Sequence, residues 1–343
     1  SMDINWTLAG NMSTVEIEYS YDGGSSWKSL ATGINASNQT WPWSISSSEN
    51  TTAAGKIKIT DEDNTNTTNT SAGDFSIKGN ITVTEPDGGE VLTYDGSSTS
   101  YVNWSYNGTI ENVTLYYSND SGSSWNTIDT VEAVDGTYDW TIPDDITGDA
   151  LVRIADEDDA SVNDTSGGTF GIAGSMLISY PNGGEDWTVG SADYVNWTPT
   201  ANYSTDVIIE YYNGSGWNTL GTQAPGTNGQ AQSFSLPTNV PNDITVSAEA
   251  RVSTNESNSS INVNDVSNAT IRIIGTIDIN VPSSGNTLYV NDTVKYINWT
   301  TNGTVTPVDI IYSVNNGGTW YDIERDYTIS SAGDISYNWN PIP

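Results

Sequence analysis

The sequence predicts an all-β protein made of tandem β-sandwich domains, and three observations lead to this prediction. Short motifs recur along the 343 residues at intervals close to the length of one sandwich domain. Within each interval apolar residues alternate with polar ones, as at Val113, Leu115 and Tyr117, which is the period of half-buried strands. Turn sequences such as Asn107-Gly108 separate these runs, and no amphipathic helix is evident.

Aromatic residues mark the repeat most clearly. One series lies in a Val/Ile-Asn-Trp motif that returns roughly once per 100 residues, and two further series keep step with it. Most first- and third-series rings are expected to fill the sandwich cores. The first series is Trp6, Trp104, Trp197 and Trp299; the second is Trp27, Trp125, Trp217 and Trp320; the third is Trp43, Trp140, Phe234 and Trp339.

The predicted domains are four repeats, 1–79, 80–174, 175–275 and 276–343. The second and third are complete and open with a Gly-Gly-Glu turn, at 86–90 and 181–185. The first starts at its Trp6 strand and lacks the opening strand, and the fourth stops at 339–343 without its closing strands. About seven short strands per complete repeat favour an immunoglobulin-like sandwich, and the near absence of linkers predicts an elongated, fairly stiff rod.

The charge balance excludes several functions. The chain has 43 Asp+Glu but only 9 Lys+Arg, no His and no Cys, for a formal net charge of −34. Such a surface repels phosphate backbones and anionic lipid, so we expect neither nucleic-acid binding nor membrane docking. Without His or Cys the common nucleophilic and zinc sites are missing, and no pair of acids stands out as a glycosidase site, so we expect no enzyme.

The chain also contains no apolar run of the roughly 18–20 residues that span a bilayer, so we expect no membrane insertion in this segment. No signal peptide precedes Ser1-Met2, which has the character of a processing remnant. The sequence is therefore expected to be either a mature secreted product or part of something longer.

The repeat resembles a known family. Its consensus runs Pro-x-Gly-Gly-Glu, x-Val-x-Trp, Tyr-Ser-x-Asp-x-Gly-x-x-Trp, Trp-Thr-Ile-Pro and Val-Arg-Ile-x-Asp, and is clearest in 80–174. This pattern resembles the immunoglobulin-like repeat of Ser/Thr-rich cell-wall proteins of fungi, which also occurs in surface proteins of archaea and bacteria. The resemblance implies an archaeal or bacterial cell-surface module, structural or adhesive, and it supplies no catalytic residue.

A hairpin motif, Ser-x-Asp-x-Gly-x-x-Trp, occurs at 20–27 and 118–125 and, with Asn in place of Asp, at 313–320. It resembles the Asp box of sialidases and β-propellers, which is a folding element of a turn. We expect the Asp to accept turn N–H groups, the Gly to take a positive φ and the Trp to pack beneath.

Two acidic loops are candidate metal sites, and each follows a strand with a basic residue. Several carboxylates in one loop could hold Ca²⁺, although the spacing is not that of an EF-hand. The alternative is a solvated loop that the neighbouring base partly neutralises. The candidate ligands are Asp61 and Asp63 in the first repeat and Asp156, Asp158 and Asp159 in the second.

Asn-x-Ser/Thr sequons are dense along the whole chain, although chance is an alternative because all three residue types are abundant. Period-two alternation turns the Asn beside each first-series Trp outward, so we expect several sequons to carry N-glycans. The candidates are Asn5, Asn35, Asn38, Asn66, Asn69, Asn103, Asn107, Asn112, Asn119, Asn196, Asn202, Asn213, Asn255, Asn258, Asn291, Asn298 and Asn302.

These features predict an extracellular structural protein that self-associates, such as a subunit of a surface layer, sheath or filament. Strand addition between incomplete terminal repeats could join successive subunits, whereas the alternative is that the chain is cut from a longer array. A second hypothesis is an adhesin stalk or a carbohydrate-binding module, for which Trp41 is the candidate sugar-binding or interface aromatic. A third is an accessory domain of a secreted hydrolase. Apart from Ca²⁺ in the acidic loops, no cofactor is expected.

Overall fold

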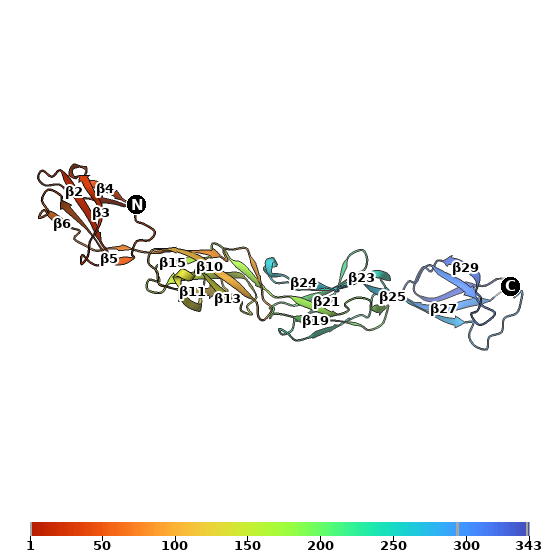
Figure 1. Ribbon diagram of the computed structural model, residues 1–343. Helices are drawn as coiled ribbons and strands as arrows, with labels where there is room; N and C mark the ends of the chain where they lie inside the picture. The colour runs from red at the N-terminus through yellow and green to blue at the C-terminus, as the bar shows by residue number, and fades with distance from the viewer. Residues whose placement is uncertain (1, 293–294, 341, 343) are drawn as a thin grey trace. The chain divides into compact units, whose positions relative to one another are not determined.

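The computed structural model describes residues 2–292, 295–340 and 342, and within them it confirms the all-β prediction (Figure 1). The only helical segments described are three short 3-10 helices, Ala36–Asn38, Ala133–Asp135 and Ser259–Ile261. None of the described helices is long and apolar enough to cross a membrane. Strands therefore carry the entire architecture, as tandem β-sandwiches.

The first sandwich is built from two antiparallel sheets. Ile4 lies opposite Trp41 in the smaller sheet, and Ile17 and Tyr19 project from the larger one into the shared core. The smaller sheet pairs β1 (Met2–Asn5) with β4 (Thr40–Trp43); the larger contains β2 (Thr14–Ser20), β3 (Lys28–Asn35), β5 (Thr52–Asp61), β6 (Thr68–Thr70) and β7 (Phe75–Ile77).

The second sandwich has a three-stranded and a six-stranded sheet. The first sheet has the order β13-β10-β8, and in the other β11 lies between β12 and β14. Val102 and Val113, one from each sheet, are fully buried. The strands are β8 (Asn80–Glu85), β9 (Val91–Thr93), β10 (Thr99–Asn107), β11 (Asn112–Ser118), β12 (Asn126–Glu132), β13 (Thr137–Thr141), β14 (Thr147–Asp156), β15 (Asn163–Thr165) and β16 (Phe170–Ala173).

The third sandwich repeats this arrangement around a continuous buried apolar cluster. Trp187 and Trp197 are fully buried in it, one from each sheet. Its first sheet contains β17 (Met176–Tyr180), β19 (Tyr194–Pro199) and β22 (Gln232–Ser235); its second contains β18 (Asp186–Thr188), β20 (Val207–Tyr212), β21 (Trp217–Gln223), β23 (Thr245–Ser253), β24 (Asn264–Val266) and β25 (Ile271–Ile274).

The fourth sandwich has five strands among its described residues, and its core centres on Ile297, Trp299 and Ile310. Its sheets are β26 (Thr276–Val281), β27 (Tyr296–Asn302) and β30 (Gly333–Asn338) on one side, and β28 (Val308–Tyr312) and β29 (Tyr321–Tyr327) on the other.

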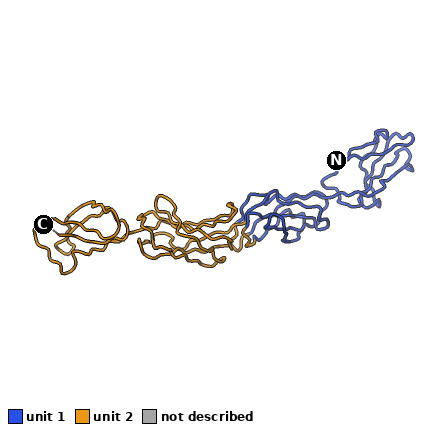
Figure 2. The backbone as a smooth tube through the Cα atoms, turned by 180° about the vertical axis from the view of Figure 1, so that it is seen from behind, with its two compact units in different colours: residues 1–92, 99–142, 147–171 blue, residues 93–98, 143–146, 172–343 orange. Residues whose placement is uncertain are grey.

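Every described strand pair lies inside one of the four predicted repeats. By residue contacts the chain divides into two compact units (Figure 2). The first unit comprises 1–92, 99–142 and 147–171; the second comprises 93–98, 143–146 and 172–343. The exact repeat boundaries at 79/80, 174/175 and 275/276 stay predictions.

Candidate functional sites

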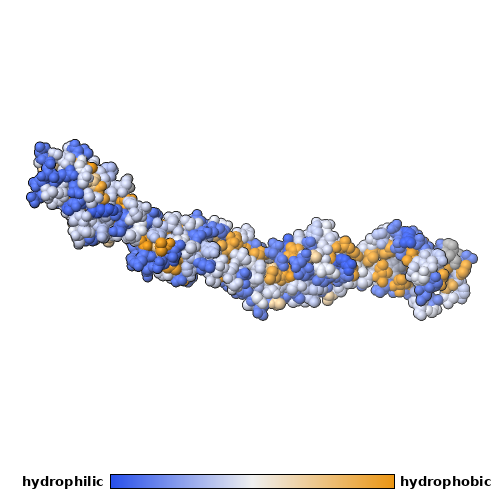
Figure 3. Space-filling model, in the orientation of Figure 1, coloured by the Kyte–Doolittle hydropathy of each residue, from blue (hydrophilic) through white to orange (hydrophobic). Residues whose placement is uncertain are grey.

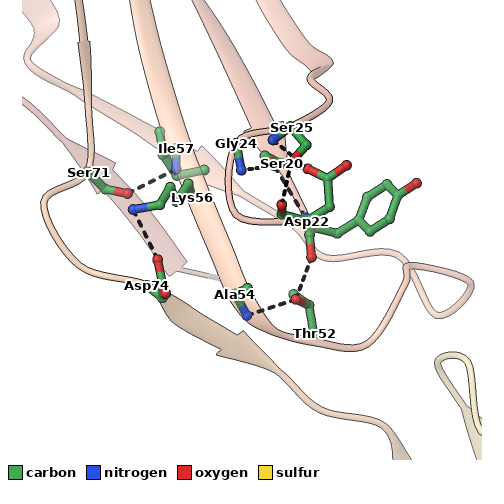
Figure 4. Close-up of polar contacts among 11 residues, drawn as sticks. Ser20, Asp22, Gly24, Ser25, Thr52, Ala54, Lys56, Ile57, Ser71 and Asp74 are labelled. Atoms are coloured by element: carbon green, nitrogen blue, oxygen red, sulfur yellow. Dashed lines mark hydrogen bonds and ion pairs between the residues drawn. The ribbon is translucent and has the colours of Figure 1, made fainter.

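The Ser-x-Asp-x-Gly-x-x-Trp hairpins are held by hydrogen bonds that converge on their acid. Asp22 accepts the backbone N–H groups of Ser25 and Ser26, both at 2.9 Å, and the Ser26 hydroxyl at 2.5 Å. Ser20 donates to Asp22 at 2.7 Å and accepts the N–H of Gly24 at 2.8 Å, so the turn closes on itself (Figure 4). Gly24 has φ +97°, which excludes most L-residues. The expected turn geometry is confirmed.

The same donors stabilise the ionised form of the hairpin acid. In the second hairpin the Ser124 hydroxyl, followed by its backbone N–H and the Ser118 hydroxyl, lowers the pKa of Asp120 to about 2. In the fourth repeat the uncharged Asn315 holds the same turn. It accepts the Thr319 N–H at 2.7 Å and donates to the Thr319 hydroxyl at 3.1 Å. Because an amide replaces the carboxylate without loss of the turn, the motif is structural.

The second tryptophan series has a role that the sequence did not reveal. Each of its first three members lies at the start of a strand, under a basic side chain that comes from the next strand but one in the same sheet. Cation-to-centroid distances are 4.5 Å for Lys58 over Trp27, 4.4 Å for Arg153 over Trp125 and 4.0 Å for Arg251 over Trp217. These are cation–π stacks at the sandwich surface, and they contribute to stability.

An acid completes the stack in two repeats but not in the second. Glu18 pairs with Lys58 at 2.6 Å, and Glu210 accepts both Nε and Nη2 of Arg251, at 2.8 and 2.6 Å. In the second repeat Tyr116 takes that place, with its ring 4.8 Å from the guanidinium of Arg153. The buried Nε of Arg153 has no hydrogen-bond partner there.

Every basic residue of the chain is engaged. Eight of the nine form ion pairs, with N···O distances of 2.6–3.6 Å, and the ninth, Arg153, lies against aromatic rings. The pairs are Lys28–Glu49, Lys56–Asp74, Lys58–Glu18, Lys78–Asp159, Arg251–Glu210, Arg272–Asp186, Lys295–Asp292 and Arg325–Asp309. Most carboxylates therefore face solvent without a positive partner.

The acidic loops use their carboxylates mainly to form turns. Asp61 is buried and accepts the N–H of Asp63 at 3.0 Å, and Asp156 accepts the N–H of Asp158 at 3.0 Å, so each loop begins with an Asx turn. Asp63 and Asp158 point to solvent.

Asp159, the last acid of the second loop, has local partners of its own. It accepts the backbone N–H of Ser161 at 3.0 Å and forms an ion pair with Lys78 at 2.9 Å. These donors, led by the Ser161 hydroxyl, lower the pKa of Asp159 to about 2. In the part of the chain that the structure describes, no three His, Cys, Asp or Glu residues come together as a metal cage.

The sequons fall into two groups by exposure. Exposed Asn residues are Asn5, Asn35, Asn38, Asn66, Asn69, Asn107, Asn202, Asn255, Asn291 and Asn302. Half-buried ones are Asn103, Asn112, Asn119, Asn196, Asn213, Asn258 and Asn298.

The side-chain nitrogen that a glycan would modify is already a donor in at least three sequons of the described residues. Asn103 donates to Glu85 at 2.7 Å, Asn202 to Asp144 at 2.6 Å and Asn213 to Asp243 at 3.4 Å. Beside the buried tryptophans, Asn196 and Asn298 have buried side-chain oxygens. Outward alternation therefore does not guarantee access, because polar side chains on flanking strands cover these positions.

Trp41 does not form an open aromatic platform. It is half-buried and packs against the core that contains Ile4 and Trp43. Exposed rings lie elsewhere: Tyr101, Tyr194 and Tyr296 occupy equivalent positions ahead of the Val/Ile-Asn-Trp motif and are 60%, 42% and 50% exposed. The sequence pattern did not single these tyrosines out, because their exposure depends on which strands flank them.

Comparison with known proteins adds no family assignment. No family model matches the chain, and no curated protein matches it. Among solved structures, the fibronectin(III)-like modules of Clostridium thermocellum CbhA align with 56% of this chain and 93% of their own length, at 9% identity and a TM-score of 0.20. The N-terminal eight Ig domains of Down Syndrome Cell Adhesion Molecule align with 95% of this chain and 45% of their own length, at 10% identity and a TM-score of 0.29. These values are too low to carry an argument about function.

Proposed function

We propose that this chain is a structural module of an extracellular assembly, a subunit of a surface layer, sheath or filament on an archaeal or bacterial cell. The main support for the proposal is that the features that recur from repeat to repeat are folding elements. The core tryptophans and the hairpin turn return in equivalent places, and bases lie over the second-series tryptophans of three repeats. No group of chemically reactive side chains recurs in this way among the described residues. A chain of repeated folding elements suits a mechanical role, and we propose no catalytic one.

The charge distribution supports an extracellular location. With all nine bases engaged, the surface is hydrated by carboxylates, amides and hydroxyls and offers few sites to trypsin-like proteases. Divalent cations, Ca²⁺ included, screen the carboxylates of Asp63, Asp158 and their neighbours in this proposal, without a dedicated cage.

N-glycans complete the proposed coat. The best acceptors are exposed Asn residues whose side-chain nitrogens make no described hydrogen bond, such as Asn5, Asn66, Asn107, Asn255 and Asn302. Asn103, Asn202 and Asn213 are poorer acceptors because a glycan would displace their bonds to carboxylates.

The proposal is tested by surface extraction of host cells followed by glycopeptide mass spectrometry. Chymotrypsin is the suitable protease because the chain has 19 Tyr and 13 Trp but only 9 Lys+Arg. We expect peptides of this chain in the surface fraction, with sugar at Asn66 or Asn107 and none at Asn202. Recovery from the cytosolic fraction, with unmodified peptides throughout, would contradict both the location and the glycans.

A second candidate, an adhesin stalk or carbohydrate-binding module, is favoured by the exposed Tyr101, Tyr194 and Tyr296. Repeated exposed rings suit stacking on sugars. Glycan-array binding that is lost in Tyr101→Ser but retained in Trp41→Phe would support this role, and no binding to any glycan would argue against it.

A further inference from the structure

Arg153 is the one base of the chain that has no acidic partner among the described residues. The other eight form ion pairs, whereas the guanidinium of Arg153 lies 4.8 Å from the ring centroid of Tyr116 and 4.4 Å from that of Trp125. Its Nε is buried without a hydrogen-bond partner, while its two terminal nitrogens are not buried. A guanidinium carries five N–H donors, so Arg153 keeps donors that no described protein group uses.

The third repeat shows what a base in this position can hold. Arg251 stacks on Trp217 at 4.0 Å and at the same time donates from Nε and Nη2 to Glu210, at 2.8 and 2.6 Å. Stacking on the ring and binding of a carboxylate are therefore compatible in this fold. In the second repeat Tyr116 occupies the register position of Glu210, so a carboxylate for Arg153 would come from another molecule.

The nearest positions on the same face of the sheet as Arg153 carry no acid. The residues opposite it are Tyr116 on β11 and Thr165 on β15, and the positions two residues away on its own strand are Leu151 and Ala155. All four are uncharged, in a chain with 43 Asp+Glu. At about 0.15 M salt the screening length is about 8 Å, so more distant acids repel an anion only weakly. An anion can therefore approach Arg153 although the net charge of the chain is −34.

Hydroxyl groups lie beside the guanidinium on this face. Thr165 lies directly opposite Arg153, and Thr127 lies opposite Tyr116 on β12, so their side chains project from the same side of the sheet. Thr127 is exposed and Thr165 is half-buried. The face of the chain seen in Figure 3 is mostly hydrophilic, but at Arg153 neutral hydroxyls and an aromatic ring surround a single positive charge.

We propose that Arg153 is a binding site for the carboxylate of an acidic sugar, such as a uronic acid residue of a surface polysaccharide. Because Nε is buried, the carboxylate meets the two terminal nitrogens, in the planar two-point geometry that guanidinium and carboxylate groups share. Thr127 and Thr165 bind sugar hydroxyls, and the Tyr116 ring packs against the sugar. The site goes beyond the proposed structural function and does not use the exposed tyrosines of the second candidate, so each can fail separately.

Nuclear magnetic resonance titration of the 343-residue chain tests the site. The probes are the methyl glycosides of glucuronic and galacturonic acid, and methyl glucoside and methyl galactoside are their neutral controls. In about 0.15 M NaCl at least one acidic probe should shift the indole N–H signal of Trp125 in a saturable way, and the neutral sugars should not. No shift with either acid, or equal shifts with the neutral sugars, would overturn the site. Acetate that binds as tightly as the sugar acids would overturn the assignment to a sugar.

Two variants test whether Arg153 carries the binding. Arg153→Gln should weaken binding of the acidic probe about tenfold or more. Tyr116→Glu should do the same and keep the fold, because its carboxylate would pair with the guanidinium from within the repeat. Arg272→Gln is the matched control and should bind as the wild-type chain does, since it removes the same charge from an exposed arginine that already pairs with Asp186 at 2.6 Å. Wild-type affinity in Tyr116→Glu, or loss of binding in Arg272→Gln, would overturn the proposal.

Discussion

Replacement of Tyr116 by Glu should stabilise the second repeat, which is unusual for a substitution of a half-buried aromatic residue. The prediction comes from comparing equivalent positions. Glu18 and Glu210 each pair with the base that stacks on a tryptophan, and Tyr116 is the exception. Tyr116→Glu would give Arg153 a carboxylate partner, as Lys58 and Arg251 have in the first and third repeats.

The magnitude follows from the burial of the pair. In the third repeat the side chains of Arg251 and Glu210 are 26% and 15% exposed, so their pairing is only partly screened by water. A hydrogen bond to a charged group contributes about 1.5–3 kcal/mol, and loss of the tyrosine stack on Arg153 costs about 0.5–1 kcal/mol. With desolvation of the new carboxylate subtracted, a net gain of about 1 kcal/mol is expected, which slows amide exchange about fivefold.

Native-state hydrogen exchange is the suitable assay, because a four-repeat chain does not unfold in one step. Amides of β11 and β14 should exchange more slowly in Tyr116→Glu, and those of the third repeat should not change. The reciprocal variant Glu210→Tyr should accelerate exchange in β20 and β23. Ser105→Glu controls for the added charge, since Ser105 is exposed on the other sheet. Unchanged or faster exchange in Tyr116→Glu would refute the reasoning.

Three further predictions concern the hairpin acid Asp120, the net charge of the chain and the tight packing at Gly79. The pKa of Asp120 is about 2 in the folded protein against an ordinary value of 3.8, so the stability that its hydrogen bonds supply is complete above about pH 4 and is lost as the pH falls toward 2. In Asp120→Asn the melting temperature of the second repeat should therefore fall less steeply with decreasing pH. An unchanged pH dependence would count against the hairpin bonds. Raising NaCl from about 0.01 M to about 1 M shortens the screening length from about 30 Å to about 3 Å. Because this weakens the repulsion among unpaired acids, the melting temperature should rise. A fall would mean that the ion pairs contribute more than this repulsion. Gly79→Ala would place a methyl 2.7 Å from the Ile110 side chain and 2.9 Å from the carbonyl oxygen of Asn107, so it should destabilise the fold around Gly79 by about 1–3 kcal/mol. Faster hydrogen exchange of the Ile110 amide measures this loss. Exchange at the wild-type rate would show that the backbone moves to relieve the contact.

The strands were predictable because their signal is local. Alternation at Val113, Leu115 and Tyr117 reflects one buried face, and all three side chains are buried in β11. The hairpin acids were also predictable, since the groups that donate to Asp22 lie within four residues of it in the sequence. In both cases the residues that interact are neighbours in sequence.

The remaining features depend on contacts between distant strands. The stack of Arg153 on Trp125 requires the register of β11 against β12 and β14, which a single sequence does not specify. The same holds for Asn103, whose outward side chain is covered by Glu85 and Thr137 from the two flanking strands. Trp41 differs from the expected open platform because the core under β4 is wide enough to take a second ring.

Electron microscopy of native cell-surface material, labelled with an antibody against this chain, tests the central claim most directly. The proposed structural function predicts label on ordered arrays, sheaths or filaments, with a regular spacing between labelled subunits. Label on dispersed single molecules, with no ordered assembly on cells that produce the protein, would contradict it.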